Sequence, residues 1–578
     1  MRKIIYSILL LLIFQSCTKD FEEINQNPSQ FISPAPEAIF TGIVKRTVDL
    51  MATNNMSYFW SYAHHLSITG GTSRYLTGDD ATWNGAYVNL LSNLQQIKRL
   101  YGDNPTYKNR IAIVNIWECY VTSYLVGIYG PIPYSQAFKT DFSVINFDSE
   151  NDIYTRLLEQ LKTASDSLDV NADKYKPDIL LGGDILKWKK FANSLRLRLA
   201  LRCQRNLPTL SASVIADIMT NESLMLTSAN DNVVLSYGTG DVNESPYYSR
   251  LVRTTISSDQ QPRMGSVLFI NLRSYKDPRM ESFFDEVLEP SQVTVLDTLP
   301  SSTFVSRDSL YVVNYKVPYF GAEKSVNILA AWGLPSPSPF GGLLANNFSK
   351  LHEDILVPDH QFTILDFSEL SLLKAEAKLL GYGGSKTAEQ YYLDGIAANF
   401  LKWDRTNLEI SAYTAQNGIK WNTSGKGFRN YTGIVTADIP LDNMAKIWRQ
   451  IWINYFPDGA FDAYCLQRRT LELDLPPHTN PGNTLLNTEY SDLPDKWEYR
   501  DNQINLNPTG HNDAIVNLLG GQNIPNQFLN FAKPYVHKNW RLVDANYNVE
   551  SVKKWYGTTI ESLKATGKPY TLITKFKK

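Results

Sequence analysis

Recurring helical periodicity is the feature that most constrains how this chain can fold. Over residues 152–168, apolar side chains recur every three or four positions and would line one face of a helix. Asp148 and Ser149, directly upstream, are plausible N-caps. The same spacing predicts helices over residues 87–100, 111–129, 185–203, 367–380, 388–403 and 442–456. A chain with so many amphipathic segments must bury helix against helix, so we predict a mainly α fold.

The predicted helices come in pairs with short links, which is typical of tetratricopeptide-like hairpins. No clean internal repeat is visible, so the hairpins are predicted from helix pairing and from the family resemblance given below. Between the pairs, residues 226–362, 404–440 and 470–530 are rich in Gly, Pro, Asn and Ser, with a brief β-like run at 309–316. Loops of this length are usually functional or disordered, and we expect ligand-binding insertions there.

The amino terminus has the pattern of an export signal. Arg2 and Lys3 precede an apolar run that stops shortly before Cys17. The run is too short to cross about 30 Å of hydrocarbon. Cysteine after the cleavage site resembles a bacterial lipobox, so we predict lipidation of Cys17. An ordinary secretory signal with an incidental cysteine is the alternative. The expected organisation is a signal peptide at 1–16, a lipidated tether at 17–36 and a single helical domain with loop-rich ligand-binding insertions at 37–578.

Charge and cysteine content exclude several classes of partner. The chain has 56 basic and 58 acidic residues, and removing Arg2 and Lys3 with the signal leaves 54 against 58, a net charge of about −4. Nucleic-acid binding needs a concentrated basic field, so we expect no nucleic-acid partner. Cys119, Cys203 and Cys465 lack the spacing of a zinc site. We predict buried free thiols, with one disulfide as the alternative.

Motifs for catalysis are scarce in this sequence. No phosphate-loop, HExxH or GxSxG pattern is present, and we predict neither a cofactor nor a metal. The pair His64-His65 is a weak metal candidate, because adjacent side chains diverge. Asp79-Asp80 could in principle act as a glycosidase pair, but a helix cap before Trp83 is the favoured interpretation. The expectation is a protein that is not an enzyme.

Several motifs occur in a characteristic order. The chain resembles the SusD/RagB family of bacterial outer-membrane lipoproteins over roughly residues 17–470. The motifs that carry the resemblance are Gly127 to Tyr134, Gly183 to Arg198, Asp277-Pro278-Arg279, Ala375-Glu376-Ala377, Tyr391 to Ile396, and Trp448 to Tyr464 followed by Arg468-Arg469-Thr470. The C-terminal part departs from the family's usual pattern, which puts ligand contacts from the last hundred residues in doubt.

The resemblance implies tetratricopeptide-like helical hairpins that form a right-handed superhelical scaffold with long irregular loops and small β-hairpins. It also implies a non-enzymatic protein at the cell outer membrane that faces the exterior. Such a protein binds an oligosaccharide and passes it to a SusC-like TonB-dependent transporter. Asp20, Glu22 and Glu23 after the anchor resemble the family's export signal. A peptide ligand in the same role remains open, and a surface hydrolase or a pure scaffold is disfavoured.

Most of the motifs that carry the resemblance have an architectural interpretation. Four residues that are spaced three or four positions apart, as on one face of a helix, should lie in the core, namely Trp188, Phe191, Leu195 and Leu199. Four arginines should bind carboxylates or carbonyls between helices, namely Arg196, Arg198, Arg468 and Arg469. Glu376 is a candidate partner for one of them.

The best candidate ligand surface is the loop from Thr69 to Trp83. Its glycines allow close backbone approach, and Arg74 and Tyr75 offer a donor fork and a flat ring. By resemblance, this loop lines the family's ligand site, so Arg74, Tyr75 and Trp83 are the leading contacts, although Trp83 could equally be core. Trp332, in a Pro/Ser-rich loop, is the next candidate, with an ordinary surface aromatic as the alternative. The supply of 33 Tyr and 12 Trp also suits stacking on sugar rings.

Overall fold

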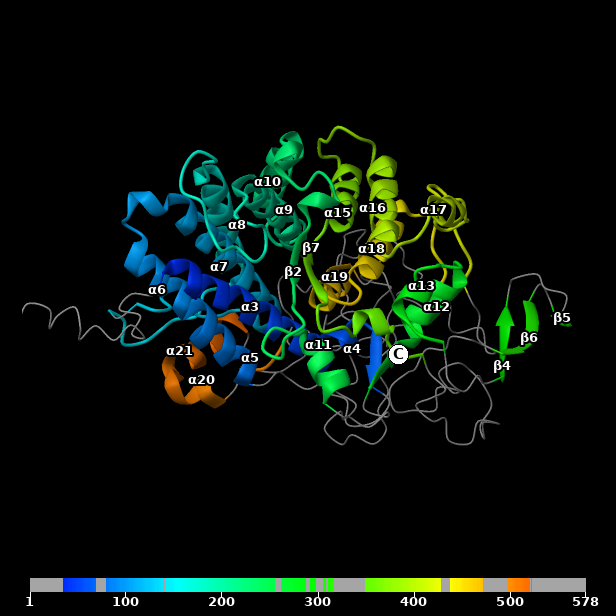
Figure 1. Ribbon diagram of the computed structural model, residues 1–578, viewed down its shortest axis with the longest axis horizontal. Helices are drawn as coiled ribbons and strands as arrows, with labels where there is room; N and C mark the ends of the chain where they lie inside the picture. The colour runs from blue at the N-terminus through cyan, green and yellow to red at the C-terminus, as the bar shows by residue number, and fades with distance from the viewer. Residues whose placement is uncertain are drawn as a thin grey trace, which may run out of the picture.

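The computed structural model describes residues 35–68, 80–139, 141–254, 261–286, 292–297, 305–307, 310–316, 349–427, 437–470, 496–499, 501–519 and 521. Helices dominate these ranges (Figure 1). The α-helices are α3 (Pro36–Asn54), α4 (Trp60–Tyr62), α5 (Asp80–Asn84), α6 (Ser92–Tyr101), α7 (Lys108–Tyr129), α8 (Glu150–Ser167), α9 (Ile185–Cys203), α10 (Pro208–Thr220), α11 (Pro246–Tyr248), α12 (Ser266–Ser274), α13 (Met280–Phe283), α15 (Phe367–Leu379), α16 (Ala388–Lys402), α17 (Asn407–Thr414), α18 (Asn443–Asn454), α19 (Ala460–Thr470), α20 (Asp501–Leu506) and α21 (Pro508–Asp513).

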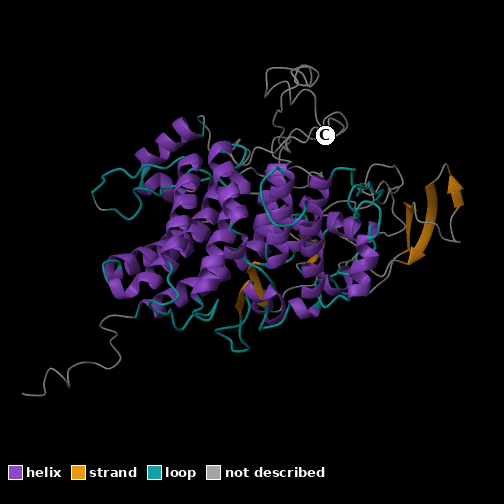
Figure 2. Cartoon of the chain, turned by 90° about the horizontal axis from the view of Figure 1, so that it is seen from above, coloured by secondary structure: helices purple, strands orange, loops and turns teal. Residues whose placement is uncertain are grey.

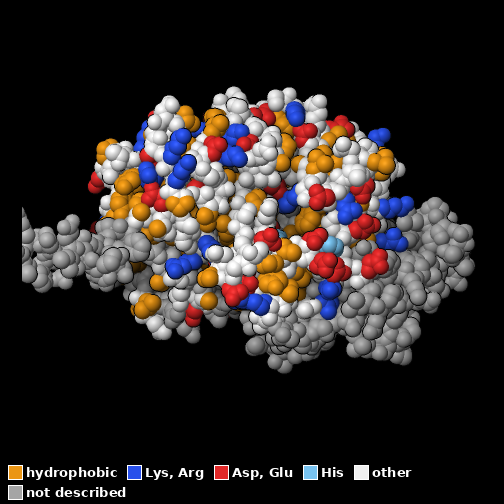
Figure 3. All heavy atoms as spheres, in the orientation of Figure 1, with side chains coloured by type: hydrophobic (Ala, Val, Ile, Leu, Met, Phe, Trp, Pro, Cys, Tyr) orange, Lys and Arg blue, Asp and Glu red, His pale blue; other side chains and the backbone are white. Residues whose placement is uncertain are grey.

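The long helices stack side by side. Helix α7 packs on α8, α8 on α9, α9 on α10 and α15, and α15 on both α16 and α18. Figures 1 and 2 show this row running across the molecule. The mainly α prediction with paired helices is therefore confirmed. Figure 3 shows acidic and basic side chains interspersed over one face of the row, as the near-neutral composition suggests.

Helix boundaries follow from local capping. The Ser149 hydroxyl accepts a hydrogen bond from the backbone N–H of Asp152 at 3.1 Å and starts α8. The Asp184 carboxylate accepts from the N–H groups of Leu186 and Lys187 and starts α9 at the predicted residue. On α9, the four predicted core residues Trp188, Phe191, Leu195 and Leu199 are fully buried. Each contributes about 1.5–3 kcal/mol of hydrophobic stabilisation.

Arginines on α9 and α19 bind partners on other helices, as the sequence predicts. Both carboxylate oxygens of Glu369 accept from Arg198 at 2.6 Å, which joins α9 to α15. Arg469 makes the same two-pronged contact with Glu376, at 2.5 and 2.7 Å, and joins α19 to α15. The other two arginines bind the carboxylate of Asp217 (Arg196) and the carbonyl of Gly127 (Arg468). These motif residues hold the scaffold together.

The turn Asp277-Pro278-Arg279 forms the most buried ionic cluster of this kind. Arg279 is 0% exposed and donates to both carboxylate oxygens of Asp277, at 2.9 and 2.5 Å. It also donates to the amide oxygens of Asn399 and Gln450, at 2.6 and 3.1 Å. Its guanidinium lies 4.7 Å from the ring centre of Phe400. The turn thereby joins the segment after α12 to α16 and α18.

Within the described ranges, the strands form three small antiparallel sheets. They pair β1 (Leu66–Ile68) with β3 (Pro262–Met264), β2 (Val233–Ser236) with β7 (Gln361–Leu365), and β6 (Leu310–Lys316) with both β4 (Gln292–Asp297) and β5 (Val305–Arg307). The β-like run at 309–316 is confirmed as β6. Figure 2 shows the three-stranded sheet at one end of the helical row.

The prediction of irregular structure was wrong for parts of 226–362, 404–440 and 470–530. These stretches contain α12, α13, α17, α20 and α21, the longest of which spans nine residues. Such helices are too short to show a clear apolar period. α17 is set locally instead, by a capping box in which the side chains of Thr406 and Glu409 each accept from the other's backbone N–H.

Helix α7 and the cysteines form part of the core. The apolar part of the Pro105–Tyr129 segment is long enough to cross a membrane, but 89% of it is buried inside the structure. Its side chains are therefore used for packing. Cys119, Cys203 and Cys465 are buried and unpaired, as predicted. Burial raises the pKa of the Cys119 thiol and the pKa of Cys203, to about 11 for the latter, so both remain protonated at neutral pH.

Candidate functional site

Most of the predicted site residues lie outside the described residues. These are Cys17, Arg74, Tyr75 and Trp332, so their predicted roles stay predictions. Trp83 is described. It belongs to α5, directly after the loop that carries Arg74 and Tyr75, and therefore marks where that loop joins the fold.

Trp83 is packed into an aromatic cluster. Its side chain is 7% exposed, and its ring centre lies 4.9 Å from that of Tyr129, edge to face at 84°. Tyr87 lies on the other side at 4.8 Å. The core interpretation weighed for Trp83 describes this ring well, and direct ligand contact by Trp83 remains untested. The buried ring of Trp83 thereby supports Tyr87, which packs against it.

Tyr87 and Phe138 extend the cluster to the surface. Tyr87 lies on the π-helical turn η2 (Gly85–Leu91), and its hydroxyl donates to the carbonyl of Pro133 at 2.6 Å. The ring of Phe138 lies 6.1 Å from that of Tyr87, tilted by 35°, and is 42% exposed. Trp83, Tyr87 and Phe138 thus form a stepped aromatic stack from core to surface. π-helical turns occur often at functional sites.

Two features of the stack escaped sequence reasoning. Phe138 has a φ of +64°, a left-handed conformation that costs energy in a residue with a β-carbon. Such strain persists only where the surroundings hold it. No local sequence motif predicts this left-handed conformation of Phe138. Tyr87 was recognised as part of a predicted helix but not as a site residue, because its exposure depends on the loop that carries Phe138.

A segment from late in the chain supports the stack from below. The backbone N–H of Trp497 donates to the carbonyl of Ile128 at 2.8 Å, and its ring stacks on Phe59 at 5.5 Å with an interplanar angle of 2°. Tyr499 lies 6.2 Å from Trp83, and its hydroxyl donates to the carbonyl of Pro131. This contact places part of the divergent C-terminal region directly beneath the candidate site.

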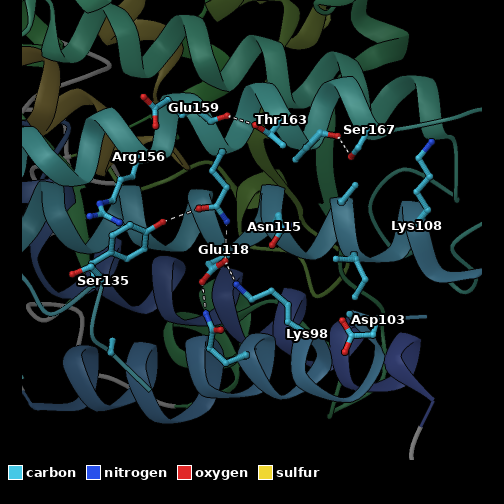
Figure 4. A pocket seen from close by; sticks show the side chains of 18 of the residues that line it. Lys98, Asp103, Lys108, Asn115, Glu118, Ser135, Arg156, Glu159, Thr163 and Ser167 are labelled. Atoms are coloured by element: carbon cyan, nitrogen blue, oxygen red, sulfur yellow. Dashed lines mark hydrogen bonds and ion pairs between the residues drawn. The ribbon is translucent and has the colours of Figure 1, made fainter. Parts of the chain in front are cut away.

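A groove with both polar and apolar lining lies beside the stack, between α6, α7 and α8 (Figure 4). Its volume is about 880 Å³. Lys98 lines it from α6, Asn115 and Glu118 from α7, and Arg156 and Gln160 from α8. Tyr134, Ser135, Ala137 and Lys139, from the loop between α7 and α8, close one end.

Glu118 ties the walls of the groove together. Its side chain is 5% exposed and accepts from Lys98 Nζ at 2.6 Å and from Gln160 Nε2 at 3.0 Å. Gln95 of α6 also donates to it. Gln160 Oε1 in turn accepts from the hydroxyl of Tyr134 at 2.8 Å. This network links all three helices, so the groove is preformed.

The buried carboxylates do not form an accessible catalytic pair in the described part of the chain. Glu369 and Asp462 lie together in the core, held by Arg198 and Arg202. Burial raises the pKa of Glu369, and the adjoining cavity measures only about 20 Å³, room for about one water molecule. Their arrangement is that of a structural ionic network.

The histidine pair is also structural. His65 is fully buried, and its Nε2 lies 3.0 Å from the carbonyl oxygen of Trp452. Burial lowers the pKa of His65 to about 3, so the ring stays neutral. Across the described ranges, no group of three or more His, Cys, Asp or Glu side chains is placed to hold a metal ion.

Comparison with known proteins identifies similar chains. A family model described as SusD-like, starch-binding and associating with the outer membrane, matches residues 19–489. No curated protein matches the chain. Among solved structures, a chitin-binding protein is 21% identical with a TM-score of 0.67, covering 86% of this chain and 100% of its own. A SusD homologue from Bacteroides uniformis is 19% identical (TM-score 0.66, 87% and 100% covered). A chitin-binding SusD homologue from Flavobacterium johnsoniae is 19% identical (0.65, 86% and 98%).

Proposed function

Because the chain belongs to the SusD-like family of starch-binding proteins that associate with the outer membrane, we propose that it captures an oligosaccharide at the cell surface and delivers it to a SusC-like transporter partner. Members of the family are binding proteins, and a glycan ligand with a SusC-like partner is the general expectation for them. Two structural relatives are chitin-binding proteins, which supports a glycan ligand for this chain as well.

The observation that carries the proposal is the aromatic stack at the end of the predicted ligand loop. A sugar ring has apolar C–H faces, and an exposed, rigid aromatic ring binds them at little cost in conformational entropy. Phe138 offers such a face, and Tyr87 holds it in place. We propose Arg74, Tyr75, Trp83 and Trp332 as further ligand contacts.

The binding test uses titration calorimetry with chito- and malto-oligosaccharides. Replacing Phe138 with Ala, or Tyr75 and Trp332 together with Ala, should weaken binding about fivefold or more, since each stacked ring contributes about 1 kcal/mol or more. Phe142→Ala is the matched control, because Phe142 is equally exposed, at 39%, and lies in the same loop. Unchanged affinity in the Phe138 and Tyr75/Trp332 variants would remove the assigned surface. Binding of peptides but not glycans would favour the alternative ligand class.

The location is tested separately. We propose a signal peptide at 1–16, a tether at 17–36 anchored through acylated Cys17, and a single receptor domain at 37–578 that faces the exterior. Cys17→Ala should release the protein from the membrane fraction, because several acyl chains are needed for stable anchoring. Retention of the variant would refute lipid anchoring. The native protein should co-purify with a TonB-dependent transporter after detergent extraction. Failure to co-purify would count against the delivery role.

A further inference from the structure

We propose that the groove between α6, α7 and α8 is a second subsite, which continues the aromatic stack and binds the far end of a long neutral oligosaccharide. The inference rests on the proposed function, because it assigns the groove to the same glycan. It adds a selectivity for chain length to that function.

The groove and the stack share one loop. Ala137 and Lys139 line the groove, and Phe138 between them contacts Tyr87. The two regions are also joined along one continuous helix, because α6 follows η2 without a break. Gln95, at the groove, comes eight residues after Tyr87, a rise of about 12 Å. A ligand that leaves the stack therefore meets the groove directly.

The size of the groove suits several sugar residues. Its wall on α8 extends from Arg156 to Ser167, a rise of about 16 Å. Small side chains, Ala112 and Ala164, form part of its lining and leave room for a ligand. With a volume of about 880 Å³, it lies in the size range of ligand pockets.

The chemistry of the lining favours a neutral, polyhydroxylated ligand. Asn115 and Arg156 point into the groove, and neither forms a hydrogen bond or an ion pair with any described residue (Figure 4). A sugar hydroxyl both donates and accepts, so it can bind the amide of Asn115 and the donors of Arg156 and Lys98. These groups lie on three different walls.

Charge and backbone geometry disfavour other ligands. The basic side chains Lys98, Lys108, Lys139 and Arg156 are nearly balanced by Asp103, Glu118 and Glu159, so no single sign of charge would be attracted. An extended peptide needs a row of backbone partners such as a sheet edge. The walls here are helices, whose backbone groups are already paired.

The test compares a short ligand with a long one, using chitotriose with chitohexaose and maltotriose with maltohexaose. In the unmodified protein, the hexamer of the bound series should bind about tenfold more tightly than its trimer. Asn115→Leu removes the groove's free amide, and Thr163→Trp fills the groove from the exposed face of α8. Both variants should lower hexamer affinity about fivefold, as expected for about one lost hydrogen bond, and leave trimer affinity unchanged.

Lys162→Trp is the matched control, because Lys162 is exposed on the same helix and does not line the groove. Equal binding of trimer and hexamer, or groove variants that bind the hexamer as the unmodified protein does, would overturn the inference while the glycan receptor role stands. Failure of both lengths in both series would refute the proposed function itself. If a peptide of residues 18–34 binds the groove and neither hexamer does, the ligand of the groove is a polypeptide and not a sugar. That result would also overturn the inference.

Discussion

The polar clusters around Arg279 and around Glu118 are both built on buried ionic groups, but they differ in how completely those groups are paired. Arg279 is fully buried, and each of its three guanidinium nitrogens donates to Asp277, Asn399 or Gln450. Glu118 is also buried, yet the side chains around it open onto a large groove in which Asn115 and Arg156 keep free hydrogen-bonding groups.

The difference separates architecture from function in this molecule. A saturated buried cluster can only hold its helices in register, because it has nothing left to offer a ligand. The second kind of cluster has a fully paired buried carboxylate, while side chains on the surrounding walls keep unpaired hydrogen-bonding groups. Such a cluster is both rigid and able to bind a ligand. Arg198, Arg279 and Arg469 each pair with a buried carboxylate, so these motif residues report the scaffold rather than the ligand.

The largest effect is expected at Arg279. Arg279→Met leaves the Asp277 carboxylate buried without its cation and should cost about 3–5 kcal/mol of unfolding free energy. Urea denaturation followed by circular dichroism measures the change. Lys162→Met is the control, since its ion pair with Asp166 is exposed on both sides and should contribute less than about 0.5 kcal/mol. Similar costs for the two variants would show that the Arg279 cluster contributes no more to stability than an exposed ion pair.

The next effect concerns the acid stability of the core. His65 has a native pKa of about 3 because it is buried, whereas the unfolded ring titrates near 6.5. The unfolded state therefore binds a proton first as pH falls, and stability is lost from about pH 6.5 down to about pH 3. By pH 4 the loss is about 3 kcal/mol, at about 1.4 kcal/mol per pH unit.

His65→Gln keeps a donor for the carbonyl of Trp452 and removes the titrating group. Relative to the unmodified protein, the variant should lose less stability between pH 7 and pH 4. Denaturation midpoints measured across this range give the comparison. Parallel pH profiles for the two proteins would show that protons reach His65 in the native state.

A smaller effect is expected at the groove floor. Lys98→Met leaves Glu118 with its two amide donors, Gln95 and Gln160, so the cost should be about 1–3 kcal/mol, below that at Arg279. Adding Glu118→Gln removes the uncompensated charge and should recover part of the loss in denaturation experiments. If the double variant recovers no stability, the contribution of Lys98 at the base of the groove comes from packing and not from its charge.

The smallest change in stability is expected at Phe138. Phe138→Gly relieves the left-handed backbone, worth about 1 kcal/mol, but loses the partial burial of the ring, so the net change should be within about 0.5 kcal/mol. Glycan affinity should nevertheless fall, as titration calorimetry would show. Phe138→Tyr keeps the ring and should keep the affinity. A large loss of stability would instead make Phe138 a structural residue.

Much of the fold was predictable because its signals are local. The apolar period and the caps at Ser149 and Asp184 set α8 and α9 within the chain itself, and both helices begin at or within two residues of the predicted starts. Glu376 could be named in advance as a partner for one of the motif arginines, since a buried guanidinium needs a carboxylate, and the structure pairs it with Arg469. The short helix α17 was missed because it has no apolar period.

The candidate site was only partly predictable. Trp83 stands next to the predicted ligand loop, yet its burial depends on Tyr129 and Tyr499, which come from distant segments. Phe138 and the groove carry no sequence motif. Their exposure results from how the loop between α7 and α8 folds back on η2.

By itself, the sequence determined the helical scaffold, the burial of rings such as Trp188 and Phe191 and the pairing chemistry of its arginines, because hydrophobic period, capping and charge complementarity act over short distances. The tertiary structure alone decided which polar side chains keep hydrogen-bond donors or acceptors available for a ligand. Whether a side chain such as Asn115 is satisfied depends on the walls that three helices bring around it, and no local pattern encodes that distance.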